Sequence, residues 1–212
     1  MPTLFHADAQ TATKLLAEAA ASATTEAPAA AAAPAKEKKA KKTKPAPVVA
    51  DPISKLDIVV GKIVDVRKHP DADSLYVEQI DCGEAEPREI CSGLVKYMQP
   101  EQLLNKEVLV LRNLKPVAMR GIKSFGMVLC ASNAAHDQIE FCTPPAGSIP
   151  GDLVRVDGFP REPDAQINKK LFEKVQPKFR VSDDLAATYD GQPWVTNRGA
   201  ITVASLAGGS IS

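Results

Sequence analysis

The spacing of apolar residues changes character near residue 53. From there to residue 156, short runs rich in valine, isoleucine and leucine alternate with turn residues, which is typical of β-strands. Gly61 interrupts the first run and predicts a bend or bulge there. Residues 100–105 predict a short helical or turn connection. The expected strands cover residues 58–66, 75–82, 88–93, 107–112, 124–132, 139–142 and 152–156.

Several short strands within about 105 positions, with no long helix between them, favour a small closed barrel over a parallel sheet. We therefore predict an all-β body built on a five-stranded OB-fold barrel over residues 53–159. This fold binds nucleic acids in some proteins and sugars in others, so it does not by itself specify a function.

Residues 160–212 have a different pattern, with signals for a helix as well as for strands, and predict a small α+β extension. Asn168 is a suitable cap for a short helix that ends near Pro177. Asp190-Gly191 is the signal of a hairpin turn, and residues 200–205 predict another strand. Because the segment has few large apolar side chains, we expect it to pack on the barrel.

Residues 1–52 form a low-complexity segment rich in alanine, proline and lysine. Such a composition cannot bury enough surface to offset the entropy of ordering, so we predict a disordered tether. Two interpretations remain for its basic run, a solubilising linker or an arm that holds polyanions by non-specific electrostatics. The run contains Lys36, Lys38, Lys39, Lys41, Lys42 and Lys44.

The 26 basic side chains balance the 26 acidic ones, and the basic run leaves the rest of the chain slightly acidic. A surface that binds anions on the body must therefore be local. No apolar run approaches the ~18 residues of a membrane span, and the first residues lack the features of a secretory signal. The four cysteines lack the close spacing of a structural zinc site. We expect a soluble cytoplasmic protein that binds neither membrane nor metal.

The sequence contains no recognisable catalytic set. There is no nucleophile elbow, phosphate-binding glycine loop, zinc-protease motif or dinucleotide fingerprint, and the chain has three histidines. The acidic pair Asp71 and Asp73 is better explained by hydrogen bonds within a turn. These observations favour a binding module without a cofactor over an enzyme.

Residues 113–127 carry a different signal, because three cations fall within nine positions and two glycines permit close approach of a backbone. A flexible basic loop of this kind suits a groove that follows a phosphate backbone. The alternative is that the charges of Lys115, Arg120 and Lys123 are merely solvated.

Five motifs in order, at residues 57–77, 92–95, 113–121, 124–132 and 144–152, resemble the tRNA-binding domain that is appended to several aminoacyl-tRNA synthetases and occurs in their accessory proteins. The later segments, at residues 157–164, 168–170 and 187–191, resemble the C-terminal extension of endothelial monocyte-activating polypeptide II and its relatives, which include the yeast-type synthetase cofactor. The resemblance implies that the extension occupies the interface through which shorter members dimerise, and that the barrel is monomeric.

The resemblance also implies a non-catalytic protein that retains or delivers tRNA for synthetases, of methionyl or glutamyl type, and recognises tRNA shape and backbone. Basic side chains would neutralise phosphates from one side of the body, and the serines would bind phosphate or sugar oxygens. Phe125 stands where glutamine is common in the family; it would stack on a base or cover the barrel mouth. The residues carried over are Lys62, Arg67, Lys68, Ser92, Lys115, Arg120, Lys123 and Ser124.

Two rival functions remain open at this point, a scaffold subunit that binds proteins and a cytokine-like signalling polypeptide. A third, a piece of a complete synthetase, has no catalytic signature before the barrel to support it.

Overall fold

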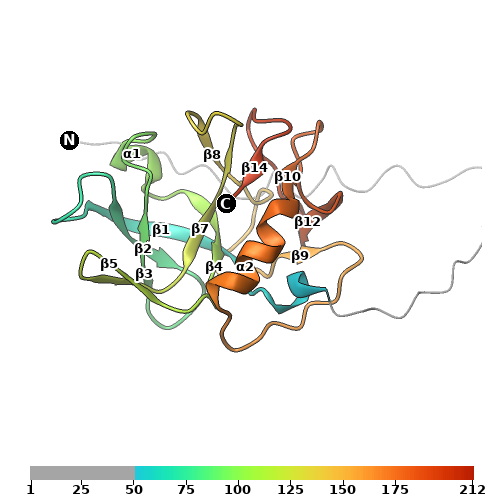
Figure 1. Ribbon diagram of the computed structural model, residues 1–212, viewed down its shortest axis with the longest axis horizontal. Coiled ribbons are helices and arrows are strands. Elements are labelled where there is room, and N and C mark those ends of the chain that lie inside the picture. Colours follow the sequence, from blue (N-terminus) through green and yellow to red (C-terminus); the bar gives the residue numbers. More distant parts are fainter. Residues whose placement is uncertain (1–50) are drawn as a thin grey trace, which may run out of the picture. The chain divides into compact units, whose positions relative to one another are not determined.

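The computed structural model describes residues 51–212 (Figure 1). The predicted disordered tether and its lysine arm lie outside the described residues. The helices are α1 (Pro100–Leu103) and α2 (Lys169–Val175), with 3₁₀ turns at Pro52–Lys55 and Gln176–Lys178. The strands are β1 (Ile58–Lys68), β2 (Tyr76–Asp81), β3 (Arg88–Ser92), β4 (Glu107–Leu111), β5 (Val117–Met119), β6 (Ile122–Ser124), β7 (Met127–Ser132), β8 (Ile139–Phe141), β9 (Arg155–Val156), β10 (Phe179–Val181), β11 (Ala187–Tyr189), β12 (Gln192–Thr196), β13 (Gly199–Ala200) and β14 (Ser210–Ile211).

The described part of the chain is mostly antiparallel β-structure. One sheet runs in the order β13-β12-β11-β10-β14-β7-β4-β1-β2-β3, with β8 on β7 and β9 on β12, while β5 and β6 form a separate hairpin. The ladder ends at β3, so it does not close as the sequence predicted. It continues instead into the extension, because β14 pairs with the second half of β7 through Ser132 and Ala131.

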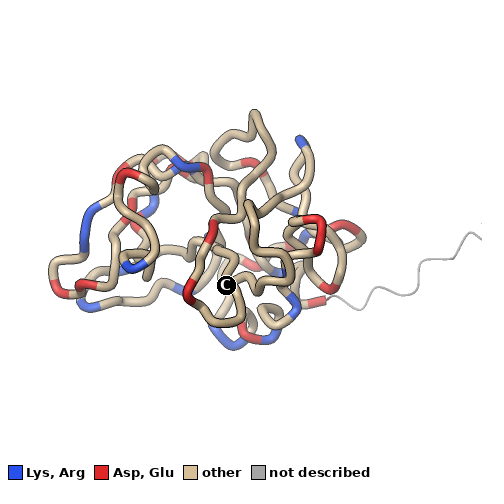
Figure 2. The backbone as a smooth tube through the Cα atoms, turned by 90° about the horizontal axis from the view of Figure 1, so that it is seen from above, with Lys and Arg blue, Asp and Glu red and all other residues tan. Residues whose placement is uncertain are grey.

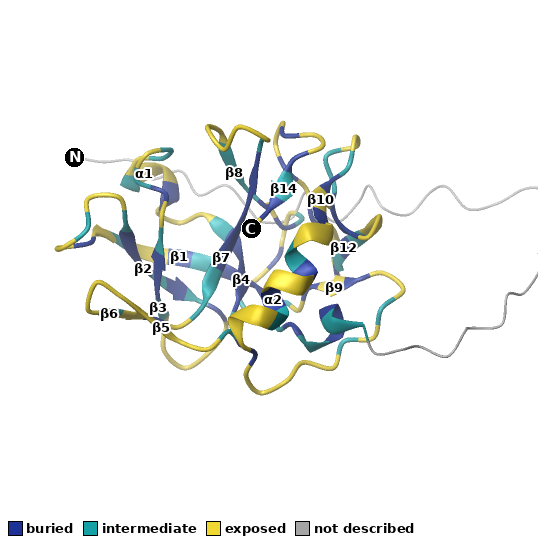
Figure 3. Ribbon diagram, in the orientation of Figure 1, coloured by how far each residue is buried: buried dark blue, intermediate teal, exposed yellow. Residues whose placement is uncertain are grey.

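The central strands are apolar at almost every position because both of their faces are covered. In β4, Val108 and Val110 enter a cluster enclosed by β1, β2, β3 and β7, whereas Leu109 and Leu111 enter a second cluster on the opposite face. The extension supplies much of this second cluster, including the fully buried Trp194. Figure 3 shows the continuous burial of β4 and β7. The prediction that the extension packs on the body is confirmed.

The irregularity in the first strand lies just beyond the glycine that predicted a bend or bulge. The register between β1 and β2 shifts between Ile63 and Asp65. Gly61 serves close packing, since a Cβ there would lie 2.7 Å from Cγ2 of Ile80 and 2.9 Å from Cγ2 of Val110. A side chain at position 61 would therefore overlap two residues of the same apolar cluster.

The extension contains the predicted helix and hairpin. The side chain of Asn168 accepts a hydrogen bond from the Leu171 amide at 2.9 Å and caps α2. Asp190 and Gly191 have φ of 52° and 81° and join β11 to β12. The predicted strand at residues 200–205 is wrong, because beyond Ala200 this segment makes only isolated bridges, from Thr202 to Thr143 and Ala186. No helix within residues 51–212 has the length and apolarity that crossing a membrane requires.

Candidate nucleic-acid interface

The predicted basic loop is an ordered β-hairpin. β5 and β6 pair over three positions, and the turn residues Arg120 and Gly121 have φ of 48° and 93°, as a tight hairpin turn demands. Lys115 lies just before β5, Arg120 at the tip and Lys123 on β6, and all three are exposed. The hairpin therefore presents three cations at fixed positions.

One side of the hairpin is attached to the turn that follows β1. The imidazole of His69 is buried, and its Nδ1 accepts a hydrogen bond from the Asp71 amide at 3.0 Å. Because Nδ1 is the acceptor, Nε2 carries the proton and donates to the Met119 carbonyl at 3.0 Å. His69 thus holds β5 against the end of β1.

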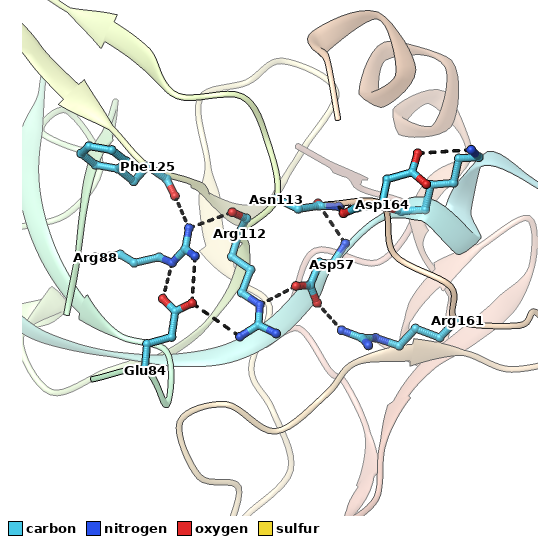
Figure 4. A network of polar contacts seen from close by, with 9 residues as sticks. Asp57, Glu84, Arg88, Arg112, Asn113, Phe125, Arg161 and Asp164 are labelled. Atoms are coloured by element: carbon cyan, nitrogen blue, oxygen red, sulfur yellow. Dashed lines mark hydrogen bonds and ion pairs between the residues drawn. The ribbon is translucent and has the colours of Figure 1, made fainter. Parts of the chain in front are cut away.

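The base of the hairpin is held by Arg88. Its Nη1 donates to the carbonyls of Arg112 and Phe125, both at 2.8 Å, and these residues flank the hairpin on either side (Figure 4). The guanidinium also binds Glu84, and this hydrogen bond holds the pKa of the Glu84 carboxyl below its usual value. The two ends of the hairpin segment are thereby joined at one point.

The same network reaches the extension. Asp57 accepts hydrogen bonds from the guanidinium groups of Arg112 and Arg161 (Figure 4). Asn113 is buried, its Oδ1 accepts from the Asp57 amide at 3.0 Å, and its Nδ2 donates to the carbonyls of Lys55 and Asp164, both at 2.9 Å. Sequence reasoning quoted Asn113 within a motif but missed this role, which joins three segments distant in the chain.

The sheet register brings several of the predicted residues together. Lys68 pairs with Tyr76 on β2, and Tyr76 pairs with Ser92 on β3. Neighbouring strands are about 4.8 Å apart, so Lys68 and Ser92 lie roughly 10 Å from each other. One position earlier on β1, Arg67 pairs with Val77 on β2, and Val77 pairs with Cys91 on β3. The amide of Cys91 donates to Ser124 of the hairpin.

Two predicted cations have acidic neighbours. Arg67 forms an ion pair with Glu89 at 2.9 Å. Lys62 lies six residues from Lys68 on β1, about 20 Å along the strand, and its register partners are Asp81 and Glu107. Figure 2 shows basic and acidic positions interspersed over the body. The predicted set is therefore not part of a uniformly basic face.

The remaining cations stay available for a ligand. Within residues 51–212, Lys68, Lys115, Arg120 and Lys123 make no ion pair within 4.0 Å with an acidic side chain. They lie on the hairpin and at the adjoining end of β1. Lys62, by contrast, lies between its acidic register partners Asp81 and Glu107.

Both predicted serines already make hydrogen bonds within the protein. Ser124 is buried; its Oγ accepts from the Cys91 amide and donates to the Gly126 carbonyl, both at 3.0 Å. Ser92 is half-buried, and its Oγ donates to Oε1 of Glu78 at 2.6 Å. Contact of either serine with RNA stays a prediction.

Glu78 is a functional candidate that sequence reasoning missed. Its side chain is fully buried, and within the described chain Oε2 has no hydrogen-bond partner. Burial raises the pKa of its carboxyl from 4.5 to about 7, although the Ser92 hydrogen bond opposes the rise. Its position in β2 was the signal, since Glu78 lies on the same face of the strand as Tyr76 and Ile80, which point into the core.

Phe125 is 40% exposed while its backbone is fixed on both sides. Its amide donates to the Glu89 carbonyl at 2.9 Å, and its carbonyl accepts from Arg88. The ring is thus accessible at the edge of β3, and its stacking on a base stays a prediction.

The cysteines are not candidate nucleophiles. All four are buried, and burial raises the pKa of Cys82 to about 11 and that of Cys142 to about 12. The thiolate, which is the reactive form, is therefore scarce near neutral pH. Among residues 51–212, no group of three histidine, cysteine or acidic side chains is placed to hold a metal ion.

Comparison with known proteins gives consistent matches. A family model described as "Putative tRNA binding domain" matches residues 58–153. The chain is 51% identical over 170 residues to cytoplasmic tyrosine–tRNA ligase of Xenopus tropicalis, covering 78% of this chain and 32% of that protein. It is 46% identical over 162 residues to aminoacyl tRNA synthase complex-interacting multifunctional protein 1 of Cricetulus griseus, covering 75% and 45%.

A solved structure matches over its full length. The C-terminal domain of Plasmodium vivax p43 superposes with a TM-score of 0.72 at 40% sequence identity, and the match covers 76% of this chain and 99% of that one. The curated relatives are longer, and the matched region spans about a third to a half of them. Since sequence, family model and fold agree, the chain belongs to the tRNA-binding domain family.

Proposed function

We propose that this protein binds tRNA without catalysing a reaction, and that it retains tRNA near aminoacyl-tRNA synthetases. The observation that carries the proposal is the basic hairpin, whose three cations have no acidic partner among residues 51–212 and whose backbone is held in place by His69 and Arg88. Fixed cations that contact phosphates bind nucleic acid by its backbone and shape, with little dependence on sequence.

The binding surface proposed here combines the hairpin with the adjoining end of β1. Lys115, Arg120, Lys123 and Lys68 neutralise phosphates, and Phe125 offers a ring for stacking. Arg67 joins them when the ligand competes with Glu89 for its guanidinium. Lys62 and the lysines of residues 36–44 contribute at longer range, in the manner of a non-specific electrostatic arm.

The domain boundaries proposed are residues 53–159 for the tRNA-binding body and 160–212 for the extension, which takes the place of a dimer partner and leaves the body monomeric. We assign the body to the OB-fold class. In support, β1, β2, β3, β4 and β7 enclose one apolar cluster, and β3 is joined to the segment before β7 by the hydrogen bonds of the Phe125 amide and the Cys91 amide.

The proposed partners are tRNA and synthetases, and the proposed location is the cytoplasm. Relatives with this region include cytoplasmic tyrosine–tRNA ligases and a probable methionine–tRNA ligase of rice, which is 48% identical over 161 residues. A methionyl-type enzyme is therefore the first synthetase to test.

Filter binding of labelled tRNA at several salt concentrations tests the proposal. The triple variant K115A/R120A/K123A should bind more weakly, and the slope of log K against log[salt] should fall in magnitude by about 2 to 3. The matched control K106A/K174A/R180A removes the same charge from three exposed positions away from the hairpin, and its slope should change by less than about one. Equal curves for the two triple variants would contradict the placement of the surface.

A scaffold function is the second candidate, and the name of the Cricetulus griseus relative, a synthetase complex-interacting protein, favours it. A pull-down from a nuclease-treated extract distinguishes the two. Synthetases recovered without tRNA support the scaffold function, whereas recovery that depends on tRNA supports retention of tRNA.

A further inference from the structure

A groove of ≈ 910 Å³ runs between the hairpin and the extension. β5 and the end of β3 form one wall, the start of β7 forms the floor, and α2 forms the opposite wall. Most of the lining is apolar. The apolar side chains on which a flat ligand could pack are those of Leu94, Leu114, Met119, Met127 and Phe172. Pockets of this size with apolar walls and a few polar groups are typical sites for small ligands or single nucleotides.

The polar group at the β3 end of the groove is the Ser92 hydroxyl, and Glu78 determines how it can bind. A hydroxyl has one proton, and Ser92 donates it to Oε1 of the buried Glu78 carboxyl. The lone pairs of Oγ are then what remains for a ligand, so Ser92 accepts hydrogen bonds there and does not donate them. Phosphate oxygens offer no donor, whereas the N–H groups of a nucleobase do.

The charges around the groove favour a phosphate outside it. Lys115 lines the rim, and it belongs to the same segment as Arg120 and Lys123. On the opposite wall, Lys169 and Glu173 neutralise each other at 3.6 Å. The net positive charge thus lies on the hairpin side, where the backbone of an RNA strand would pass, and the apolar groove lies beside it.

We propose that the groove accepts an unstacked nucleobase of the bound RNA, with the exocyclic amine of the base donating to Ser92 and its phosphate near Lys115. The inference rests on the proposed function, since it names what one part of that surface recognises. Proteins that read RNA sequence commonly take up splayed bases on apolar side chains and hydrogen-bond their edges. α2 of the extension then supplies one wall of the site.

The four methionines of the chain make the proposal testable by NMR on the full-length protein labelled with ¹³C at the methionine methyl groups. Met119 and Met127 line the groove, whereas Met98 lines a different cavity, beside Lys62, and serves as the internal control. Adenosine 5′-monophosphate should shift the methyl signals of Met119 and Met127 and leave that of Met98 unchanged. Inorganic phosphate should shift none of the three.

The hydrogen bond to Ser92 is tested with a matched pair of ligands. Purine riboside 5′-monophosphate lacks the exocyclic amine of adenosine 5′-monophosphate and should bind about 3- to 10-fold more weakly. In S92A the two nucleotides should bind equally, whereas S74A, which changes an exposed serine outside the groove, should keep the difference. Because S92A also leaves Glu78 without its partner, the ligand pair is first measured on the unmodified protein, where it needs no variant.

The outcomes separate this inference from the proposed function. Unchanged signals of Met119 and Met127, in a protein that still retains tRNA on filters, overturn the nucleobase site and leave tRNA binding standing. Failure to retain tRNA contradicts the proposed function itself. If an apolar peptide shifts these signals and the nucleotides do not, the groove docks protein and the proposal is wrong.

Discussion

The buried carboxyl of Glu78 should make the stability of the protein depend on pH. Its pKa is about 7 in the folded chain against 4.5 for the exposed group. Between these values the folded state holds a proton that the unfolded state has lost, so stability falls as pH rises through the window from 4.5 to 7. A difference of 2.5 pKa units corresponds to a loss of about 3 kcal/mol by pH 8, at about 1.4 kcal/mol per unit.

The variant E78Q isolates this effect, because glutamine occupies nearly the same volume and does not titrate. Urea unfolding followed by the fluorescence of Trp194 provides the free energy of unfolding, since this single tryptophan is fully buried in the core of the extension. All other titrating groups are shared by the two proteins. From pH 4.5 to 8, the stability of E78Q relative to the unmodified chain should therefore rise by about 3 kcal/mol.

The comparison concerns the change with pH and not the stability at one pH, because an imperfectly paired amide at this position has a cost of its own. E86Q, at an exposed position, is the control and should leave the pH profile unchanged. Parallel profiles for E78Q and the unmodified chain would mean that Glu78 is already ionised in the folded protein at pH 5, and the argument from burial would fail.

Three further substitutions test the structure. G61A should lower the free energy of unfolding by about 1 to 3 kcal/mol, measured by the same urea titration, because the new methyl group would overlap Ile80; an unchanged midpoint would contradict the close packing. N113A removes three hydrogen bonds of a buried side chain and leaves partly buried backbone groups unpaired, so a loss of about 2 to 4 kcal/mol is expected, and a loss below about 0.5 kcal/mol would show that the junction is not held there. E89Q should strengthen tRNA binding about 2- to 5-fold at low salt by releasing Arg67 and removing a negative charge, since an exposed ion pair contributes less than about 1 kcal/mol; weaker binding would place Arg67 outside the interface.

The extension illustrates how one segment can affect both stability and binding. Phe172 belongs to the second apolar cluster and also lines the groove, so the helix that covers the outer face of the sheet is also a wall of the proposed nucleobase site. Removing residues after 160 would therefore expose an apolar face and open the groove at once.

Local patterns in the chain were sufficient to predict most of the longer strands, the helix α2 and one hairpin turn. β-branched runs placed the strands, Asn168 placed the start of α2, and Asp190-Gly191 placed a hairpin, because caps and tight turns depend on neighbouring residues. The resemblance of the motifs identified the family and the basic segment. The chemistry of Lys115, Arg120 and Lys123 as phosphate-neutralising groups follows from their residue types, and their contact with RNA stays a prediction.

The tertiary structure decided which groups are neighbours. The sheet continues from the body into the extension because β14, the last strand, pairs with β7, and a pairing over such a sequence distance leaves no local pattern. In the sequence, Arg67 and Lys62 are indistinguishable from free cations. In the fold, Arg67 forms an ion pair with Glu89, and Lys62 lies between its register partners Asp81 and Glu107. The acceptor character of Ser92 comes from a carboxyl on another strand. Residue type and spacing determine what a side chain can do, whereas hydrogen bonding, burial and charge act through space, and these depend on which distant segments the fold brings together.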